Sequence, residues 1–180
     1  MKPWNRSALA VAVIALAAVV GGCESLEQLG GKRNDSLSDA DNRFFKRAAI
    51  SDMTEARTSR LALQKSDSQR VKQFAQMMVD DHAKVSREMA RLADRKGVDL
   101  PKQLDAPSER VVDTLAGTSS GQEFDRAYIR AQVTAHEEAV ANYEDAAEMA
   151  KDQDVRRFAK EHLPTLREHL RMAKNIADKL

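Results

Sequence analysis

The sequence predicts an all-α protein whose folded part is a bundle of four long helices. Aromatic residues make up only 4% of the chain, whereas charged residues make up 32%. Runs of β-branched residues are absent after the N-terminal segment, and Ala, Leu, Met, Glu, Lys and Arg dominate, which are strong helix formers. Apolar residues then recur every three or four positions over four stretches of about 26 to 30 residues. This spacing is typical of helices that bury one face.

Residues 1–22 are typical of a secretion signal. Two basic residues precede an apolar stretch, residues 8–20, whose length of about 13 residues is too short for a membrane span, which needs roughly 20. Residues 20–23 (VGGC) resemble a bacterial lipobox. We therefore expect cleavage before Cys23, the only cysteine, and lipidation of its thiol. An uncleaved anchor or an ordinary signal peptide is the alternative.

Lipidation of Cys23 would anchor the mature protein to a membrane without crossing it. The two or three acyl chains of a bacterial lipoprotein attach it stably to a membrane, whereas a single chain gives only marginal attachment. Glu24 follows the cysteine, and by resemblance to enterobacterial sorting this predicts the outer membrane, facing the periplasm. The mature chain would keep 27 basic and 28 acidic residues, a net charge of −1. Nothing in this balance indicates a nucleic-acid partner.

The polar residues that follow, through residue 37, lack helical periodicity, and we interpret 23–37 as a lipidated tether. One domain then covers residues 38–180, a common domain size. Ser38 is an N-cap residue that predicts a first helix over about 39–65.

The second helix is expected over about 68–96, capped by Ser68 and ended by Gly97 in the left-handed conformation. The connection that follows, residues 97–119, is long and could hold a short helix over 107–116.

The third helix is expected to begin at a capping box formed by Ser120 and Glu123. Asp152 or Asp154 begins the fourth helix, which reaches the C-terminus.

Histidines carry the functional signal. Of the four in the chain, His82, His136 and His169 fall near the middle of three different helices, each on the apolar stripe. Histidine is a poor core filler and a good metal ligand. The first helix has no histidine, but Glu55 is the one charged residue on its stripe. A buried carboxylate must be protonated, paired with a cationic group or bound to a metal.

These residues suit a site for one Zn²⁺, Cu²⁺ or Fe²⁺ ion. A hairpin between the second and third helices would bring His162 level with Glu55, whereas a crossover along the whole bundle would bring His169 there. Because about 23 residues suffice for a crossover, we favour His169. The predicted ligands are therefore Glu55, His82, His136 and His169. Possible outer partners are Asp80, Asp81 and Glu137. A metal-free hydrogen-bonded network of the same residues is the alternative.

Several motifs resemble a known family. They are Glu55, Leu61-Ala62, 71–75 (VKQFA), 78–82 (MVDDH), 124–128 (FDRAY), 135–137 (AHE), Leu163-Pro164, Leu166 and His169. Together they are similar to the domain of unknown function 4142 (DUF4142) over about 40–180, a ferritin-like family often labelled as outer-membrane proteins. The resemblance implies a ferritin-like four-helix bundle with a long crossover and supports His169. It implies little about activity.

A di-iron centre of the ferritin type is not expected. Such centres carry Glu-x-x-His pairs, but the residues three positions before the four histidines are Val79, Val133, Ala159 and Leu166. The leading hypothesis is a non-enzymatic envelope lipoprotein that binds one metal ion. A metal-free structural or interaction module in envelope stress or adhesion is the second hypothesis. A metal-dependent enzyme is the weakest, because the chain lacks a nucleophile constellation, a phosphate loop and a second metal motif.

Overall fold

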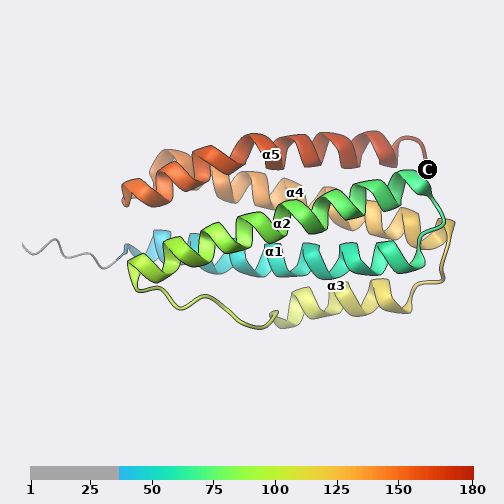
Figure 1. Ribbon diagram of the computed structural model, residues 1–180, viewed down its shortest axis with the longest axis horizontal. Coiled ribbons are helices and arrows are strands. Elements are labelled where there is room, and N and C mark those ends of the chain that lie inside the picture. The colour runs from blue at the N-terminus through green and yellow to red at the C-terminus, as the bar shows by residue number, and fades with distance from the viewer. Residues whose placement is uncertain (1–36) are drawn as a thin grey trace, which may run out of the picture. The chain divides into compact units, whose positions relative to one another are not determined.

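A computed structural model describes residues 37–180. The predicted signal, Cys23 and all of the tether except Leu37 lie outside these residues. The described part contains five helices and no strand (Figure 1), which confirms the predicted fold class. The helices are α1 (Asp39–Lys65), α2 (Gln69–Lys96), α3 (Ala106–Gly117), α4 (Gln122–Met149) and α5 (Gln153–Ala177). None of the described helices is long and apolar enough to cross a membrane.

Most helix ends follow the local signals in the sequence. The hydroxyls of Ser38 and Ser68 accept hydrogen bonds from the third backbone N–H of α1 and α2. Gly97 ends α2 with a φ of 66°, a conformation that glycine adopts without strain. Asp152 caps α5 with its carboxylate.

The start of α4 differs from the prediction. The capping box of Ser120 and Glu123 does not form, because Gly121 precedes the helix and no side chain caps it. Gly121 has a φ of 87° and donates its N–H to the carbonyl oxygen of Lys65 at 2.9 Å. This tertiary bond holds the start of α4 against the end of α1, while the first N–H groups of α4 have no side-chain acceptor among the described residues.

The connection between α2 and α4 crosses the whole bundle, as predicted. It contains α3 and runs beside α1, so that α4 is parallel to α2, and α5 is antiparallel to both (Figure 1). An ion pair joins α2 to α5 at one end, where Lys96 Nζ lies 2.8 Å from Asp152 Oδ2 at the start of α5. Only Leu115 of α3 is buried, and α3 packs on the outside of α1 and α4.

Two apolar clusters lie along the bundle, one on each side of a polar midsection. The first, which we call the Phe45 cluster, contains Phe44, Phe45, Tyr143 and Phe158. The second, the Phe74 cluster, contains Phe74, Phe124, Tyr128 and Ile129. Aromatic rings interlock within both clusters, for example Phe44 and Tyr143 at 5.0 Å between centroids. The midsection between them holds the candidate site.

Candidate metal centre

The four predicted ligands meet in the middle of the bundle. Glu55 comes from α1, His82 from α2, His136 from α4 and His169 from α5, so each long helix contributes one side chain. All four are buried, with exposed fractions of 4% or less. His169 rather than His162 completes the cluster because the crossover makes α2 and α4 parallel.

The polar atoms of this cluster are close together. Glu55 Oε2 lies 3.2 Å from His136 Nε2 and 3.4 Å from His82 Nε2. One ring nitrogen from each of His82, His136 and His169 lies within 4.8 Å of the others. The rings of His136 and His169 meet nearly edge to face, with centroids 5.4 Å apart.

Each histidine of the cluster is held through its other ring nitrogen. The pairs are His82 Nδ1 with Asp52 Oδ1 (2.6 Å), His136 Nδ1 with the carbonyl oxygen of Gln132 (2.9 Å) and His169 Nε2 with Asp81 Oδ2 (2.9 Å). All three partners are acceptors, so each can take one N–H from its ring. When a ring is neutral, its remaining nitrogen carries a lone pair; for His82 this requires loss of the proton that its raised pKa of about 8 favours. This is how metal-binding histidines are usually oriented.

Four buried atoms of the cluster have no hydrogen-bond partner within the described residues. They are Glu55 Oε2, His82 Nε2, His136 Nε2 and His169 Nδ1. The two distances from Glu55 are short enough for ion pairs, yet these atoms do not form hydrogen bonds. A tetrahedral ion with bonds of 2.0–2.1 Å would hold its ligand atoms about 3.3 Å apart. The two separations from Glu55 Oε2 fit that value, whereas the three histidine nitrogens lie within 4.8 Å of one another.

Charges in the cluster are balanced by close pairing. Burial alone would raise the pKa of Glu55, but His136 and His82 outweigh it and lower the pKa, so the carboxylate is ionised. Burial lowers the pKa of His82, but Glu55 and Asp52 outweigh it and raise the pKa to about 8. Burial lowers the pKa of His169, which favours its neutral, metal-binding form.

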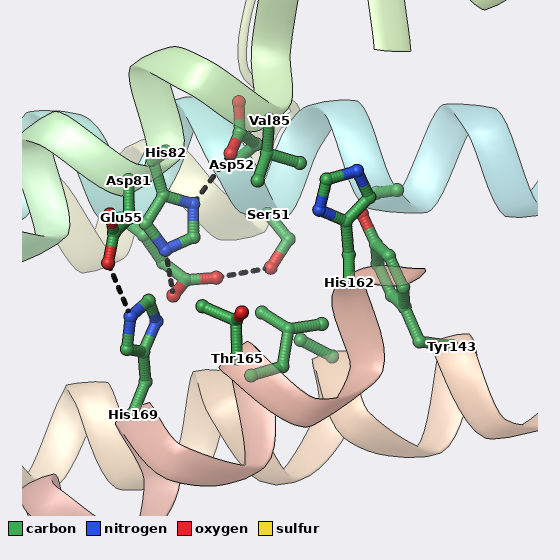
Figure 2. Close-up of a pocket in the computed structure, with 13 residues that line it drawn as sticks. Ser51, Asp52, Glu55, Asp81, His82, Val85, Tyr143, His162, Thr165 and His169 are labelled. Carbon is green, nitrogen blue, oxygen red and sulfur yellow. Dashed lines mark hydrogen bonds and ion pairs between the residues drawn. The ribbon is translucent and has the colours of Figure 1, made fainter. Parts of the chain in front are cut away.

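A cavity of about 20 Å³ adjoins the cluster and extends along the bundle toward His162 (Figure 2). A space of this size holds about one water molecule or ion. His162 lies on the far side of Thr165 from His169 (Figure 2). Its ring packs on Phe158, with centroids 4.4 Å apart, and its Nε2 lies 3.1 Å from Glu88 Oε2. The structure therefore does not bring His162 into the cluster.

Of the three predicted outer partners, only Asp81 supports a histidine. Asp80 accepts a hydrogen bond from Gln76 on the surface of α2 (3.0 Å), and Glu137 pairs with Lys174 (2.7 Å). The prediction was wrong for these two because successive helical residues are rotated by about 100°. An acidic residue next to an inward histidine in sequence can therefore face away from it.

Asp52 is the supporting residue that the sequence interpretation missed. Its carboxylate contacts His82 and also accepts a hydrogen bond from Ser86, and burial raises its pKa. Asp52 lies one turn before Glu55, so the signal was a second acidic residue near the apolar stripe of the first helix. On the other side of Glu55, the hydroxyl of Ser51 donates to Oε1 at 2.6 Å.

Comparisons with known proteins identify the family. Two solved structures share the fold: a DUF305 fragment from Deinococcus radiodurans (TM-score 0.71, 17% identity, covering 81% of this chain and 99% of that one), and a DUF305 protein from Streptomyces coelicolor described as secreted (TM-score 0.66, 16% identity, 81% and 94%). No curated protein matches the sequence. The profile of a domain of unknown function, DUF4142, matches residues 27–176. The chain therefore belongs to the DUF4142 family.

Proposed function

We propose that the bundle binds one transition metal ion, Zn²⁺, Cu²⁺ or Fe²⁺, through Glu55, His82, His136 and His169. One observation supports this proposal above the others: four buried atoms without hydrogen-bond partners, one from each of the four long helices, lie close together. The three histidine atoms are within 4.8 Å of one another, and Glu55 Oε2 is within 3.4 Å of two of these rings. An unpaired buried polar atom costs about 1–3 kcal/mol. A bound cation would satisfy all four at once.

The four proposed ligands favour a structural or storage role for the ion over a catalytic one. Three imidazole nitrogens and one carboxylate oxygen fill a tetrahedral coordination shell, and catalytic sites usually keep one position open. The adjoining cavity of about 20 Å³ leaves little room for a substrate. We therefore propose a non-enzymatic role for the ion.

A metal-free bundle is the second candidate. The pairing of His82 with two carboxylates supports it, because the raised pKa of about 8 lets this histidine carry a proton at neutral pH and pair with Glu55. In that case the domain would be a structural or protein-interaction module, with the same residues serving as a polar network.

Metal analysis of the mature protein distinguishes the two candidates. Protein purified without added metal, and again after exposure to Zn²⁺, Cu²⁺ or Fe²⁺, would be analysed by mass spectrometry for bound metals. We expect about one ion per chain, and at least a tenfold loss of affinity in His136→Gln, because removing a ligand should cost no less than the 10–100-fold typical of an outer-shell partner. The matched control is His162→Gln, which removes a buried histidine outside the cluster and should keep one ion. No stoichiometric metal, together with no change in melting temperature on metal addition, would establish the metal-free alternative.

We also propose that the protein is held in the cell envelope through a lipid on Cys23. The lipobox-like residues 20–23 support this proposal, as does the description of one fold relative as secreted. Cys23→Ser should move the protein from the membrane fraction to the soluble fraction, because the attached acyl chains would be lost. Unchanged membrane association of this variant would contradict lipid anchoring at Cys23.

A further inference from the structure

The seam between α2 and α5 carries the same pair of side chains twice. Asp81 of α2 pairs with His169 of α5 at 2.9 Å, and Glu88 of α2 pairs with His162 of α5 at 3.1 Å. The two acids are seven residues apart, and so are the two histidines. Because the helices are antiparallel, the second pair lies two turns, or about 10.5 Å, along the seam from the first.

The layer that contains His162 corresponds to the metal centre, position by position. A shift of seven residues along each long helix leads from the four predicted ligands to Ala48, Met89, Tyr143 and His162. Ala48 stands where the centre has Glu55, and its small side chain leaves space. The same cavity is lined by Ala48, Tyr143 and His162 from this layer and by Glu55, His82 and His169 from the centre (Figure 2). The two layers therefore share one internal space.

His162 is a buried histidine with a ring nitrogen that forms no hydrogen bond within the described residues. Its side chain is 9% exposed, and its Nε2 has no hydrogen-bond partner although Glu88 Oε2 lies 3.1 Å away. In this respect the pair differs from Asp81 and His169, which form a hydrogen bond, and resembles Glu55 and His136, whose atoms lie 3.2 Å apart, near the 3.3 Å expected for two ligands of one ion. The side chain of Glu88 is 26% exposed. It can thus meet a hydrated ion from solvent while His162 faces the interior.

We propose that His162 and Glu88 form a loading site for the transition metal ion, from which the ion passes through the shared cavity to the centre. This inference rests on the proposed function of the centre. The loading site offers one imidazole and one carboxylate, with water completing the shell, so it binds more weakly than four protein ligands. Weak binding suits a site that must release its ion inward.

The opposite side of the centre is a poorer entrance. A groove of about 830 Å³ runs beneath α3, between α1 and α4, and shares the wall formed by Ala48, Ser51, Ala139 and Tyr143 with the inner cavity. None of the described residues that line this groove is a histidine, cysteine or methionine, and its charged residues are Arg47, Asp105, Glu138 and Asp145. The groove thus offers carboxylates without an imidazole, whereas the seam offers a borderline metal ion both an imidazole and a carboxylate.

The rate of Zn²⁺ uptake tests the loading site. Metal-free mature protein would be mixed in a stopped-flow instrument with Zn²⁺ and a chromophoric chelator. We expect Glu88→Gln and His162→Gln to take up Zn²⁺ about tenfold more slowly than the wild type at low ionic strength, and to reach the same final occupancy of one ion. Glu144→Gln is the matched control, since it removes the same charge from an exposed pair with Arg167. It should load at the wild-type rate.

The outcomes separate the two proposals. If the wild type binds one Zn²⁺ and both seam variants load at its rate, the loading site is wrong and the centre stands. If either seam variant, folded by circular dichroism, loses the final occupancy, the loading site is also wrong, because that residue then belongs to the centre. If the wild type binds no Zn²⁺, the proposed function fails and the loading site fails with it. Glu88→Gln alters a partly exposed residue, so it carries the test should His162→Gln fail to fold.

Discussion

The Phe45 and Phe74 clusters and the polar midsection between them are built on the same four helices, yet they contribute to stability in opposite directions. In the clusters, inward positions hold aromatic and aliphatic side chains, and burial of each large one stabilises the fold by about 1.5–3 kcal/mol. In the midsection, the equivalent positions hold three histidines and Glu55, whose inward atoms have no hydrogen-bond partner in the described structure. The clusters thus supply the stability that keeps these unpaired polar atoms buried. A bound ion would make the contribution of the midsection to folding stability favourable.

The largest expected effect comes from removing an aromatic ring from a cluster. Phe74 is 2% exposed and packs against Tyr128, with ring centroids 6.3 Å apart. Phe74→Ala should lower the free energy of unfolding by about 4 kcal/mol, because it leaves a cavity among well-packed neighbours. Urea unfolding followed by circular dichroism would measure this loss. Zn²⁺ stoichiometry should stay unchanged, since Phe74 belongs to an apolar cluster that contains none of the proposed ligands.

Met149→Ala is the control for this experiment. Met149 is 70% exposed at the end of α4, and its replacement should change the free energy of unfolding by less than about 0.5 kcal/mol. A loss below 1 kcal/mol in Phe74→Ala would contradict the view that the apolar clusters, and not the midsection, stabilise the metal-free bundle.

A smaller effect is expected from loss of a hydrogen bond between the Phe74 cluster and the midsection. The hydroxyl of Tyr128 forms a buried hydrogen bond with Ser59 at 2.9 Å. Tyr128→Phe should lower the free energy of unfolding by about 1 kcal/mol, because Ser59 would be left buried without this partner. The matched control is Tyr143→Phe, since the hydroxyl of Tyr143 makes no hydrogen bond with any residue between 37 and 180. Equal losses in thermal or urea unfolding would show that this bond does not stabilise the boundary.

Local patterns predicted the helices well, because caps and apolar stripes act within a few residues. Ser38, Ser68 and Gly97 fix helix ends through bonds or conformations that their own segments determine. The start of α4 could not be predicted in this way. Gly121 bonds to Lys65, a residue 56 positions earlier in the numbering, and no local pattern reports such a contact.

The convergence of the four proposed ligands could be predicted because each lies on the inward stripe near the middle of its helix, and because the length of the crossover decided between two histidines. The residues that hold the histidines in place, such as Asp52 and Asp81, could not be predicted in this way. Which acid holds each histidine depends on how far each helix is rotated, and a difference of one residue, as between Asp80 and Asp81, turns a side chain from the surface to the seam.

The smallest expected effect concerns an ion pair far from the midsection, where α2 ends and α5 begins. Asp152 caps α5 and pairs with Lys96. Burial alone would raise the pKa of Asp152, but Lys96 and the backbone N–H groups it caps outweigh burial and lower the pKa below its ordinary value of 3.8. A lowered pKa means that the folded state favours the charged carboxylate. The resulting stabilisation is fully present above pH 3.8 and is lost as the pH falls through the lower folded value.

Asp152→Asn isolates this charge, because asparagine caps a helix about as well as aspartate. The variant should be about 0.5 kcal/mol less stable than the wild type at pH 7, a small value because the pair is partly exposed to solvent. Urea unfolding of both proteins from neutral pH downward should show a constant difference that shrinks only below pH 3.8. If the difference in the free energy of unfolding already disappears between pH 7 and pH 5, the titrating group is a histidine and not Asp152. That result would contradict this explanation of the effect of Asp152.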